Sequence, residues 1–372
     1  MSPLKNIKKK LVSQNLDAYA VPKNDEYFQE YSNPNILEYI TNFKGSAGLA
    51  LITKKENLLF VDGRYTTQAK KEAGKNFKII EINKESVKKI ISSYNCTMRI
   101  GYSPKLFTSL NLGMIFGNNC QMVPQKQEIR KHINKVYTKK NNFFYSLSKD
   151  IIGESVKSKI DRLIKVLQKK KVSNIYISSP ENVAWLLNIR GSDNPNSPIP
   201  YCQIILNKNK IYFFSDEQKT TILKRKKILN NIEYFNKERF FDVIKKISGS
   251  NFLVDKNTCS IYDESLIRTK FNLFFDNDPC YQLKSIKNKV EIKNTKKIHL
   301  YDGLALTKFL YYLKNKKFDF DEIKLEKKLE EFRKRHNTYL FPSFNTISGS
   351  GPNSAIIHYK ANKFSNRKIK RG

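Results

Sequence analysis

Residues 343–360 read SFNTISGSGPNSAIIHYK, and this stretch decides the fold class of the chain. Two short apolar runs flank a break rich in glycine, serine, proline and asparagine, a composition typical of two strands joined by a turn. The second run ends in His358. A histidine that closes an apolar strand is more often structural than catalytic, so these residues alone leave both interpretations of His358 open.

The same stretch resembles the start of the catalytic domain of Xaa-Pro aminopeptidases, which are metallopeptidases of the pita-bread fold. In that family a strand, a glycine loop and a second strand end in Ile-His-Tyr, as residues 357–359 do here. The match continues through 361–362 (Ala-Asn) and 365–367 (Ser-Asn-Arg). The resemblance implies that His358 is a catalytic residue that faces the substrate.

The metal ligands of that family are expected to lie outside this chain. In the complete family enzyme two aspartates, a histidine and two glutamates downstream of this stretch hold two divalent metal ions, for which the resemblance implies manganese. Here fourteen residues follow His358, and no carboxylate side chain occurs after Glu331. Divalent cations need oxygen ligands that offset their charge, whereas this tail is rich in lysine and arginine. We therefore expect a chain truncated before its metal site, which binds no metal ion and is inactive alone.

The composition is that of a modular globular protein. The chain has 372 residues, of which 40% are hydrophobic, and single cores stop growing at about 250 to 300 residues. No apolar run approaches the roughly 20 residues needed to cross a bilayer, and the lysine-rich start lacks a signal-peptide core. The five scattered cysteines, which never have a C-x-x-C spacing, fit free thiols in a reducing compartment. We expect a cytoplasmic protein without a membrane partner.

The net charge of +35 ordinarily points to nucleic acid or an anionic membrane. The lysines are, however, spread along the chain, together with abundant isoleucine and asparagine. Short basic runs such as 8–10, 169–171 and 224–227 fall where helix surfaces are expected. Solvated helix faces are the favoured interpretation and a polyanion partner is the alternative, so no nucleic-acid partner is expected.

The N-terminal part of the sequence repeats itself. Residues 39–46 (YITNFKGS) align with residues 185–192 (WLLNIRGS) at an offset of 146 residues. A strand-like run precedes both copies, and a pair of strand-like runs follows each, ending at Asp62 and at Asp216. Loop insertions account for small differences in spacing. Two diverged copies of one α/β domain are the economical explanation, with Asp62 as a helix cap.

This tandem also resembles known domains. Residues 43–48 (FKGSAG) and 61–65 (VDGRY) are similar to the first creatinase-type N-terminal domain, and residues 188–193 (NIRGSD) to the second. The predicted fold is therefore α/β, with two tandem creatinase-type N-terminal domains followed by an incomplete pita-bread (α+β) catalytic domain. The predicted boundaries are 1–150, 151–285 and 286–372.

Two helices are predicted at the start of the third domain. Residues 282–291 resemble the family's connector, and apolar residues at helical spacing from Ile298 onward predict a long amphipathic helix. Asp319 stands three residues before Glu322, the spacing of a capping box, which predicts a second helix over about residues 320–336.

Other polar residues carry weaker signals. For Arg190 and Asp193, at the second repeated turn, an internal ion pair that holds this turn is the favoured interpretation, and a substrate-binding position at the border of the substrate mouth is the alternative. The remaining histidines, His132, His299 and His336, have no second ligand at helical spacing and are predicted to be structural.

The family resemblance implies one reaction, hydrolysis of the bond between an N-terminal residue and a following proline. Its implied partners are proline-containing peptides and, in the complete enzyme, a second copy in a homodimer. His358 is then expected to donate a hydrogen bond at the scissile bond. One alternative is a non-catalytic peptide-binding or scaffold protein of the same fold. A creatinase or prolidase is less favoured, because those relatives carry one N-terminal domain.

Overall fold

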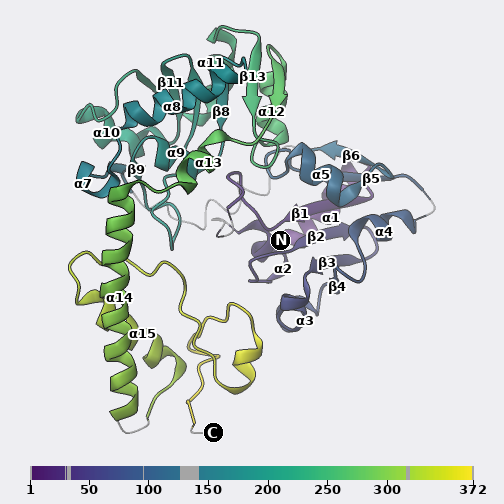
Figure 1. Cartoon of the computed structure of the whole chain (residues 1–372). Helices are drawn as coiled ribbons and strands as arrows, with labels where there is room; N and C mark the ends of the chain where they lie inside the picture. The colour runs from purple at the N-terminus through teal and green to yellow at the C-terminus, as the bar shows by residue number, and fades with distance from the viewer. Residues whose placement is uncertain are drawn as a thin grey trace. The chain divides into compact units, whose positions relative to one another are not determined.

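The computed structural model describes residues 2–29, 31, 35–94, 96–125, 142–315 and 319–370. The chain forms two compact units (Figure 1). The first comprises Met1–Ser148 and Glu154–Ile286, and the second comprises Lys149–Gly153 and Lys287–Gly372. The boundaries at 150 and 285 stay predictions.

The first unit begins with a six-stranded sheet in the order β4-β3-β2-β1-β5-β6. Its strands are β1 (Ala18–Pro22), β2 (Leu49–Thr53), β3 (Asn57–Val61), β4 (Lys78–Glu81), β5 (Met98–Tyr102) and β6 (Cys120–Pro124). β2 pairs antiparallel with β1 and β3, and the other pairs are parallel. The helices are α1 (Pro3–Ser13), α2 (Ile36–Thr41), η1 (Gly63–Tyr65), α3 (Thr66–Ala73), α4 (Val87–Ser92) and α5 (Ser109–Phe116).

A second six-stranded sheet follows in the order β12-β11-β10-β8-β13-β14. Its strands are β8 (Asn174–Ile177), β10 (Gln203–Asn207), β11 (Lys210–Phe214), β12 (Ile232–Phe235), β13 (Asn251–Val254) and β14 (Asn272–Phe275). The accompanying elements are β7 (Tyr145–Ser146), α8 (Val156–Lys169), α9 (Pro180–Leu186), β9 (Ile189–Arg190), η2 (Glu217–Thr220), α10 (Thr221–Arg225), η3 (Lys237–Arg239), α11 (Phe240–Lys246), α12 (Ile261–Arg268) and α13 (Pro279–Ser285). Strand for strand, the order matches that of the first sheet, which confirms the predicted duplication.

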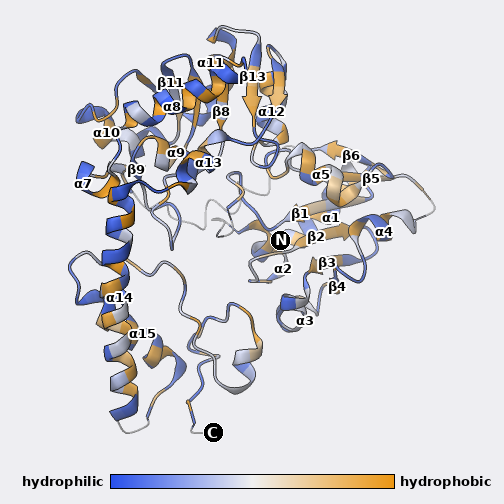
Figure 2. Ribbon diagram, in the orientation of Figure 1, coloured by the Kyte–Doolittle hydropathy of each residue, from blue (hydrophilic) through white to orange (hydrophobic). Residues whose placement is uncertain are grey.

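The central strands of both sheets are covered on both faces. β1, β2, β8 and β10 are buried along their whole length, and Figure 2 shows the apolar residues gathered on the strands. Such continuous burial explains why these strands are nearly uniform runs of apolar residues rather than alternating ones. Each sheet has its own core, one cluster around the first and two around the second.

The repeated Asn-apolar-basic-Gly turn begins with a left-handed asparagine in both copies. Asn42 follows α2 with φ 64°, and Asn188 follows α9 with φ 54°, the left-handed region that asparagine tolerates better than most residues. The glycine is required by close contacts, because a Cβ on Gly45 would lie 2.1 Å from Phe43 Cζ and one on Gly191 would lie 2.8 Å from Pro200 Cα. The conserved spacing between the copies therefore has a local steric cause.

The acidic end of each repeated hairpin also plays one role in both copies. The Asp62 side chain accepts a hydrogen bond from Arg64 N at the start of η1, and Asp216 accepts one from Gln218 N at the start of η2. In both copies an α-helix follows directly, so the predicted capping role of Asp62 is confirmed as the cap of the short helix that leads into α3.

Asn42→Ala is expected to lower the free energy of unfolding by about 1 kcal/mol, because alanine in the left-handed region places its Cβ close to the following carbonyl. Asn42→Gly should stay within about 0.5 kcal/mol of the parent, since glycine adopts this region freely. Urea unfolding of both variants checks this pair. A loss in the glycine variant equal to that in the alanine variant would show that the side chain, rather than the backbone angle, matters.

The second unit contains two packed helices, α14 (Lys289–Asn315) and α15 (Glu322–Lys334), next to α7 (Lys149–Ile152). The Tyr301 ring stacks on that of His336 with centroids 3.7 Å apart, and Arg333 Nε lies 2.6 Å from Asp302 Oδ1. Both predicted helices are therefore confirmed, and His336 has the predicted structural role. His299 lies exposed on α14, and His132 lies outside the described residues.

The predicted cap of the second helix was wrong. The N-cap of α15 is Asp321, whose side chain accepts from Lys324 N at 2.8 Å, and not Asp319. Asp319 instead lies 3.5 Å from Lys324 Nζ, with a largely exposed side chain. The chain remains extended at Asp321, where it forms a bridge with Lys368, so the helix begins two residues later than the capping-box spacing indicated.

The predicted pair of strands within residues 343–360 was also wrong. The described residues there form a 3-10 helix, η4 (Gly351–Ala355), and a turn at His358, where φ is 55°. A strand needs a hydrogen-bonded neighbour, and within the described residues none pairs with this segment. The apolar residues of this segment are weakly buried, because Ile347 and Ile357 are 51% and 41% exposed, whereas Ile175 and Ile204 in the second sheet are 0% exposed.

Within the described residues, no helix combines the length and the apolar character needed to span a lipid bilayer.

Candidate functional site

The Glu322 carboxylate collects hydrogen bonds from four points of the segment that carries His358. Its Oε1 accepts from Ser350 N at 2.6 Å and from Asn353 Nδ2 at 3.0 Å. Its Oε2 accepts from the Tyr359 hydroxyl at 2.8 Å and from Arg367 N at 3.1 Å. Glu322 is the first residue of α15 and is fully buried, so this helix end anchors an otherwise irregular segment.

A second layer of contacts surrounds this carboxylate. Asn353 Nδ2 also donates to Ser365 O at 2.7 Å, and the Tyr359 hydroxyl lies 2.9 Å from Ser365 Oγ. Both Asn353 and Tyr359 are buried. We call the set of these residues the Glu322 cluster; its members are Glu322, Ser350, Asn353, Tyr359, Ser365 and Arg367.

The protonation states of the cluster are set by these contacts. Burial by itself raises the pKa of Glu322, but the hydrogen bonds from Asn353, Ser350 N, Tyr359 and Arg367 N outweigh it and hold the pKa below its usual value. Burial raises the pKa of Tyr359, and so does its hydrogen bond to the charged Glu322. At neutral pH Glu322 is therefore an ionised acceptor, and Tyr359 is a neutral donor.

His358 sits in the chain directly before Tyr359. The φ of 55° lies in the left-handed region, which is uncommon for residues other than glycine, and the ring meets that of Phe344 edge to face with centroids 5.4 Å apart. The imidazole is half-buried. The substrate-facing role of His358 stays a prediction.

Arg190 and Asp193 lie in the second sheet region of the first unit. Arg190 Nη1 donates to Ala184 O at 3.1 Å and to Ile189 O at 2.8 Å. Asp193 forms an ion pair with Lys219, and its Oδ2 accepts from Tyr201 N at 2.7 Å. These contacts stabilise the turn after β9, and a substrate-binding role for either residue stays a prediction.

The described residues do not provide the ligands of a two-metal centre. Among them, no group of three or more histidine, cysteine, aspartate or glutamate side chains is placed to hold a metal ion. The buried Glu322 carboxylate already accepts hydrogen bonds on both of its oxygens, which occupies the lone pairs that a metal would need.

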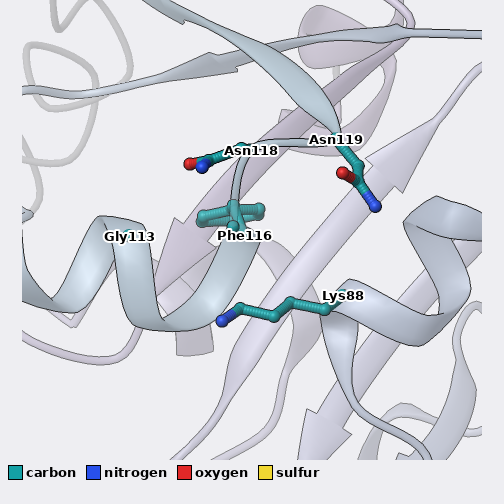
Figure 3. A pocket seen from close by; sticks show the side chains of 6 residues that line it. Lys88, Gly113, Phe116, Asn118 and Asn119 are labelled. Atoms are coloured by element: carbon teal, nitrogen blue, oxygen red, sulfur yellow. The ribbon is translucent and has the colours of Figure 1, made fainter.

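A hollow of about 460 Å³ lies in the first sheet region, between α4 and the turn after α5. Figure 3 shows Lys88 on one side and Asn118 and Asn119 on the other. Asn119 Nδ2 donates to Ser92 Oγ at 2.9 Å, which ties this turn to α4. The described residues that line the hollow include no carboxylate, histidine or cysteine.

Glu322 is the residue whose importance sequence analysis missed. It was noted only as a partner in a helix cap, because its four donors lie 28 to 45 residues further along the chain. The sequence did contain a sign of this role. Glu322 is an acidic residue at a predicted helix start, and residues 332–372 hold polar donors but no carboxylate.

Comparisons with known proteins cover nearly the whole chain. Two family models, both described as the creatinase/prolidase N-terminal domain, match residues 3–131 and 135–291. A third, the metallopeptidase family M24, matches residues 293–372. The matches fall in the predicted order, two N-terminal domains and then the start of a catalytic domain.

Individual relatives agree with these models. The chain is 29% identical over 97% of its length to a probable Xaa-Pro aminopeptidase P of Pyrenophora teres f. teres, of which it covers 59%. It is 27% identical over 96% of its length to Xaa-Pro aminopeptidase 1 of Dictyostelium discoideum, of which it covers 61%.

A solved structure is similar as well. The crystal structure of an X-prolyl aminopeptidase from Caenorhabditis elegans, described as a cytosolic enzyme with a di-nuclear active site, matches 95% of this chain with a TM-score of 0.85 and 25% identity. This chain covers 61% of that structure, so it spans about three fifths of the length of the relatives that it matches. The resemblance noted in the sequence is thereby confirmed: residues 293–372 are similar to the metallopeptidase family M24, and residues 3–131 and 135–291 are similar to creatinase/prolidase N-terminal domains.

Proposed function

We propose that this chain forms the N-terminal three fifths of an Xaa-Pro aminopeptidase, which releases the N-terminal residue from peptides that have proline in second position. The observation that carries the proposal is the extent of the match. Relatives named Xaa-Pro aminopeptidase align with 96–97% of the chain, through both N-terminal domains and into the M24 region. For the same reason a non-catalytic peptide-binding protein is not favoured.

The complete enzyme is proposed to act on proline-containing peptides. For this reaction it would use two divalent metal ions, which we propose to be manganese. The description of the C. elegans relative as a cytosolic enzyme with a di-nuclear active site supports the metal pair and a cytoplasmic location. A homodimer is proposed by family resemblance. The metal ions would supply an activated water and polarise the scissile carbonyl.

His358 is proposed to donate a hydrogen bond to the substrate at the scissile bond. A donor placed there stabilises the negative charge that develops as the carbonyl is attacked. Arg190 and Asp193 are proposed to border the substrate mouth through the turn after β9. This second assignment is supported by their place in the repeated turn. The described contacts of both side chains stabilise that turn.

The proposal is tested with a fusion enzyme. Residues 1–372 are joined to the part of the P. teres relative that follows its match to this chain, and the product is loaded with Mn²⁺. We expect release of the N-terminal residue from a peptide with proline second and none from the same peptide with alanine second, and we expect a chelator to abolish it. A folded, metal-loaded fusion that cleaves neither peptide would contradict the proposal.

The 372-residue chain alone is expected to bind no metal pair and to leave Xaa-Pro peptides intact, because its described residues offer no set of metal ligands. Elemental analysis after dialysis against Mn²⁺, together with a peptide-cleavage assay, checks both statements. Proline-specific release that a chelator abolishes would refute them.

A further inference from the structure

We infer that Glu322 is a positioning residue that sets the conformation of the segment carrying His358, through hydrogen bonds to Ser350, Asn353, Tyr359 and Arg367. The catalytic importance of that conformation rests on the proposed function. The conformational statement itself concerns this chain and can be tested on it directly.

The first argument is how the contacts are distributed. The four donors to Glu322 span residues 350–367, and two of them are backbone N–H groups, Ser350 N and Arg367 N. Glu322 N in turn donates to Arg367 O at 3.2 Å, and Ile323 N donates to Asn366 Oδ1 at 3.2 Å. The start of α15 thus fixes both ends of the segment, and the buried side chains of Asn353 and Tyr359 fix its middle.

The second argument is the backbone at His358. A non-glycine residue at φ 55° is energetically unfavourable and persists where its surroundings over-determine it. Here Tyr359, the next residue, is held at its hydroxyl by Glu322 and at its N–H by Ile356 O at 3.2 Å. Ile356 N itself donates to Asn353 O at 3.1 Å. His358, with its unusual backbone angle, therefore lies between Asn353 and Tyr359, and both of these residues contact Glu322.

The third argument is the charge of the acceptor. Hydrogen bonds to an ionised carboxylate are roughly twice as strong as those between neutral groups. In Glu322→Gln the amide NH₂ must replace either Oε1 or Oε2. Because Oε1 faces Ser350 N and Oε2 faces Arg367 N, both orientations set a donor against a backbone donor. A substitution that keeps the shape of the side chain should therefore release one end of the segment.

The test uses the 372-residue chain and three variants. Glu322→Gln and Tyr359→Phe remove contacts of the cluster. Glu331→Gln is the matched control, because this exposed glutamate of α15 pairs with Lys328 of the same helix. Hydrogen exchange across residues 343–367 and the NMR signal of the His358 ring are measured, with His299 as the internal reference for the ring signal.

We expect exchange at Ser350 and Arg367 to become about tenfold faster or more in Glu322→Gln, in line with the loss of a hydrogen bond to a charged group. The His358 signal should move, the His299 signal should stay, and Tyr359→Phe should give a smaller effect of the same kind. The control should match the parent. Unchanged exchange and an unmoved His358 signal in a folded Glu322→Gln variant would overturn the inference.

The fusion enzyme separates this inference from the proposed function. Glu322→Gln should lower kcat about tenfold with little change in KM, while Glu331→Gln leaves both unchanged, since a positioning defect acts on the reacting geometry. If the parent fusion is inactive while hydrogen exchange still responds to Glu322→Gln, the proposed function fails and the conformational role stands. If the fusion is active and Glu322→Gln changes neither kcat nor exchange, the positioning role fails.

Discussion

His358→Ala is expected to lower the kcat of the fusion enzyme by about 100-fold to 1000-fold, the loss typical of removing one donor that stabilises a developing negative charge. KM should change little, because such a hydrogen bond strengthens in the transition state rather than in the bound substrate. Steady-state cleavage of a peptide with proline in second position measures both constants.

His299→Ala is the matched control for this experiment, because His299 is an exposed histidine of α14 in the same unit. It should retain the parent kcat. A His358→Ala fusion with undiminished kcat would remove His358 from the reaction, whatever the conformation of its segment.

Lys159→Ala is expected to lower the free energy of unfolding of the second sheet region by about 3 kcal/mol. Lys159 lies on α8 with 1% exposure, and its Nζ donates to Trp185 O at 2.9 Å and to Asn188 Oδ1 at 2.7 Å. Removing the donor leaves one buried and one part-buried acceptor without it, each at a cost of about 1 to 3 kcal/mol. The ammonium also lies 4.5 Å from the centre of the Trp185 ring, a contact that is lost as well.

Urea unfolding followed by Trp185 fluorescence reports on this region, because Trp185 is the one tryptophan in the chain. Lys157→Ala removes an exposed lysine of the same helix and should stay within about 0.5 kcal/mol of the parent. Equal effects of the two substitutions would show that the buried contacts of Lys159 contribute nothing.

The sequence predicted those features whose causes are local. Asn42 and Asn188 could be aligned because each sits in a short turn with its glycine three residues on, and Asp62 could be assigned as a cap because its acceptor role depends on the next two residues. Once the two copies were aligned, both could be assigned to one α/β fold. Neither inference needed to know which distant segments come together.

The features that were missed or wrong depend on distant partners. Residues 355–357 are apolar enough for a strand, but a strand exists only beside another one, and the segment contacts Glu322 and its neighbours instead. Asp319 was predicted as the cap from its spacing alone, whereas the N-cap is Asp321, a residue that forms a bridge with the distant Lys368. Tertiary contacts outweighed local preference in each case.

Two sheets that share the same strand order within one chain can misassemble during folding. In such a misassembly a hairpin of one copy adds to the sheet of the other. The side-chain volumes in the central pairs oppose this exchange. In the first sheet Ala20 faces Leu51 and Val21 faces Ala50, so that each pair contains an alanine. In the second sheet Ile177 faces Ile204 and Ile175 faces Leu206, so that both members of each pair are large. A swapped hairpin would leave voids or overfill the core, both of which destabilise it. In these pairs the divergence of the two copies therefore disfavours strand exchange, while the strand order of the two sheets stays the same.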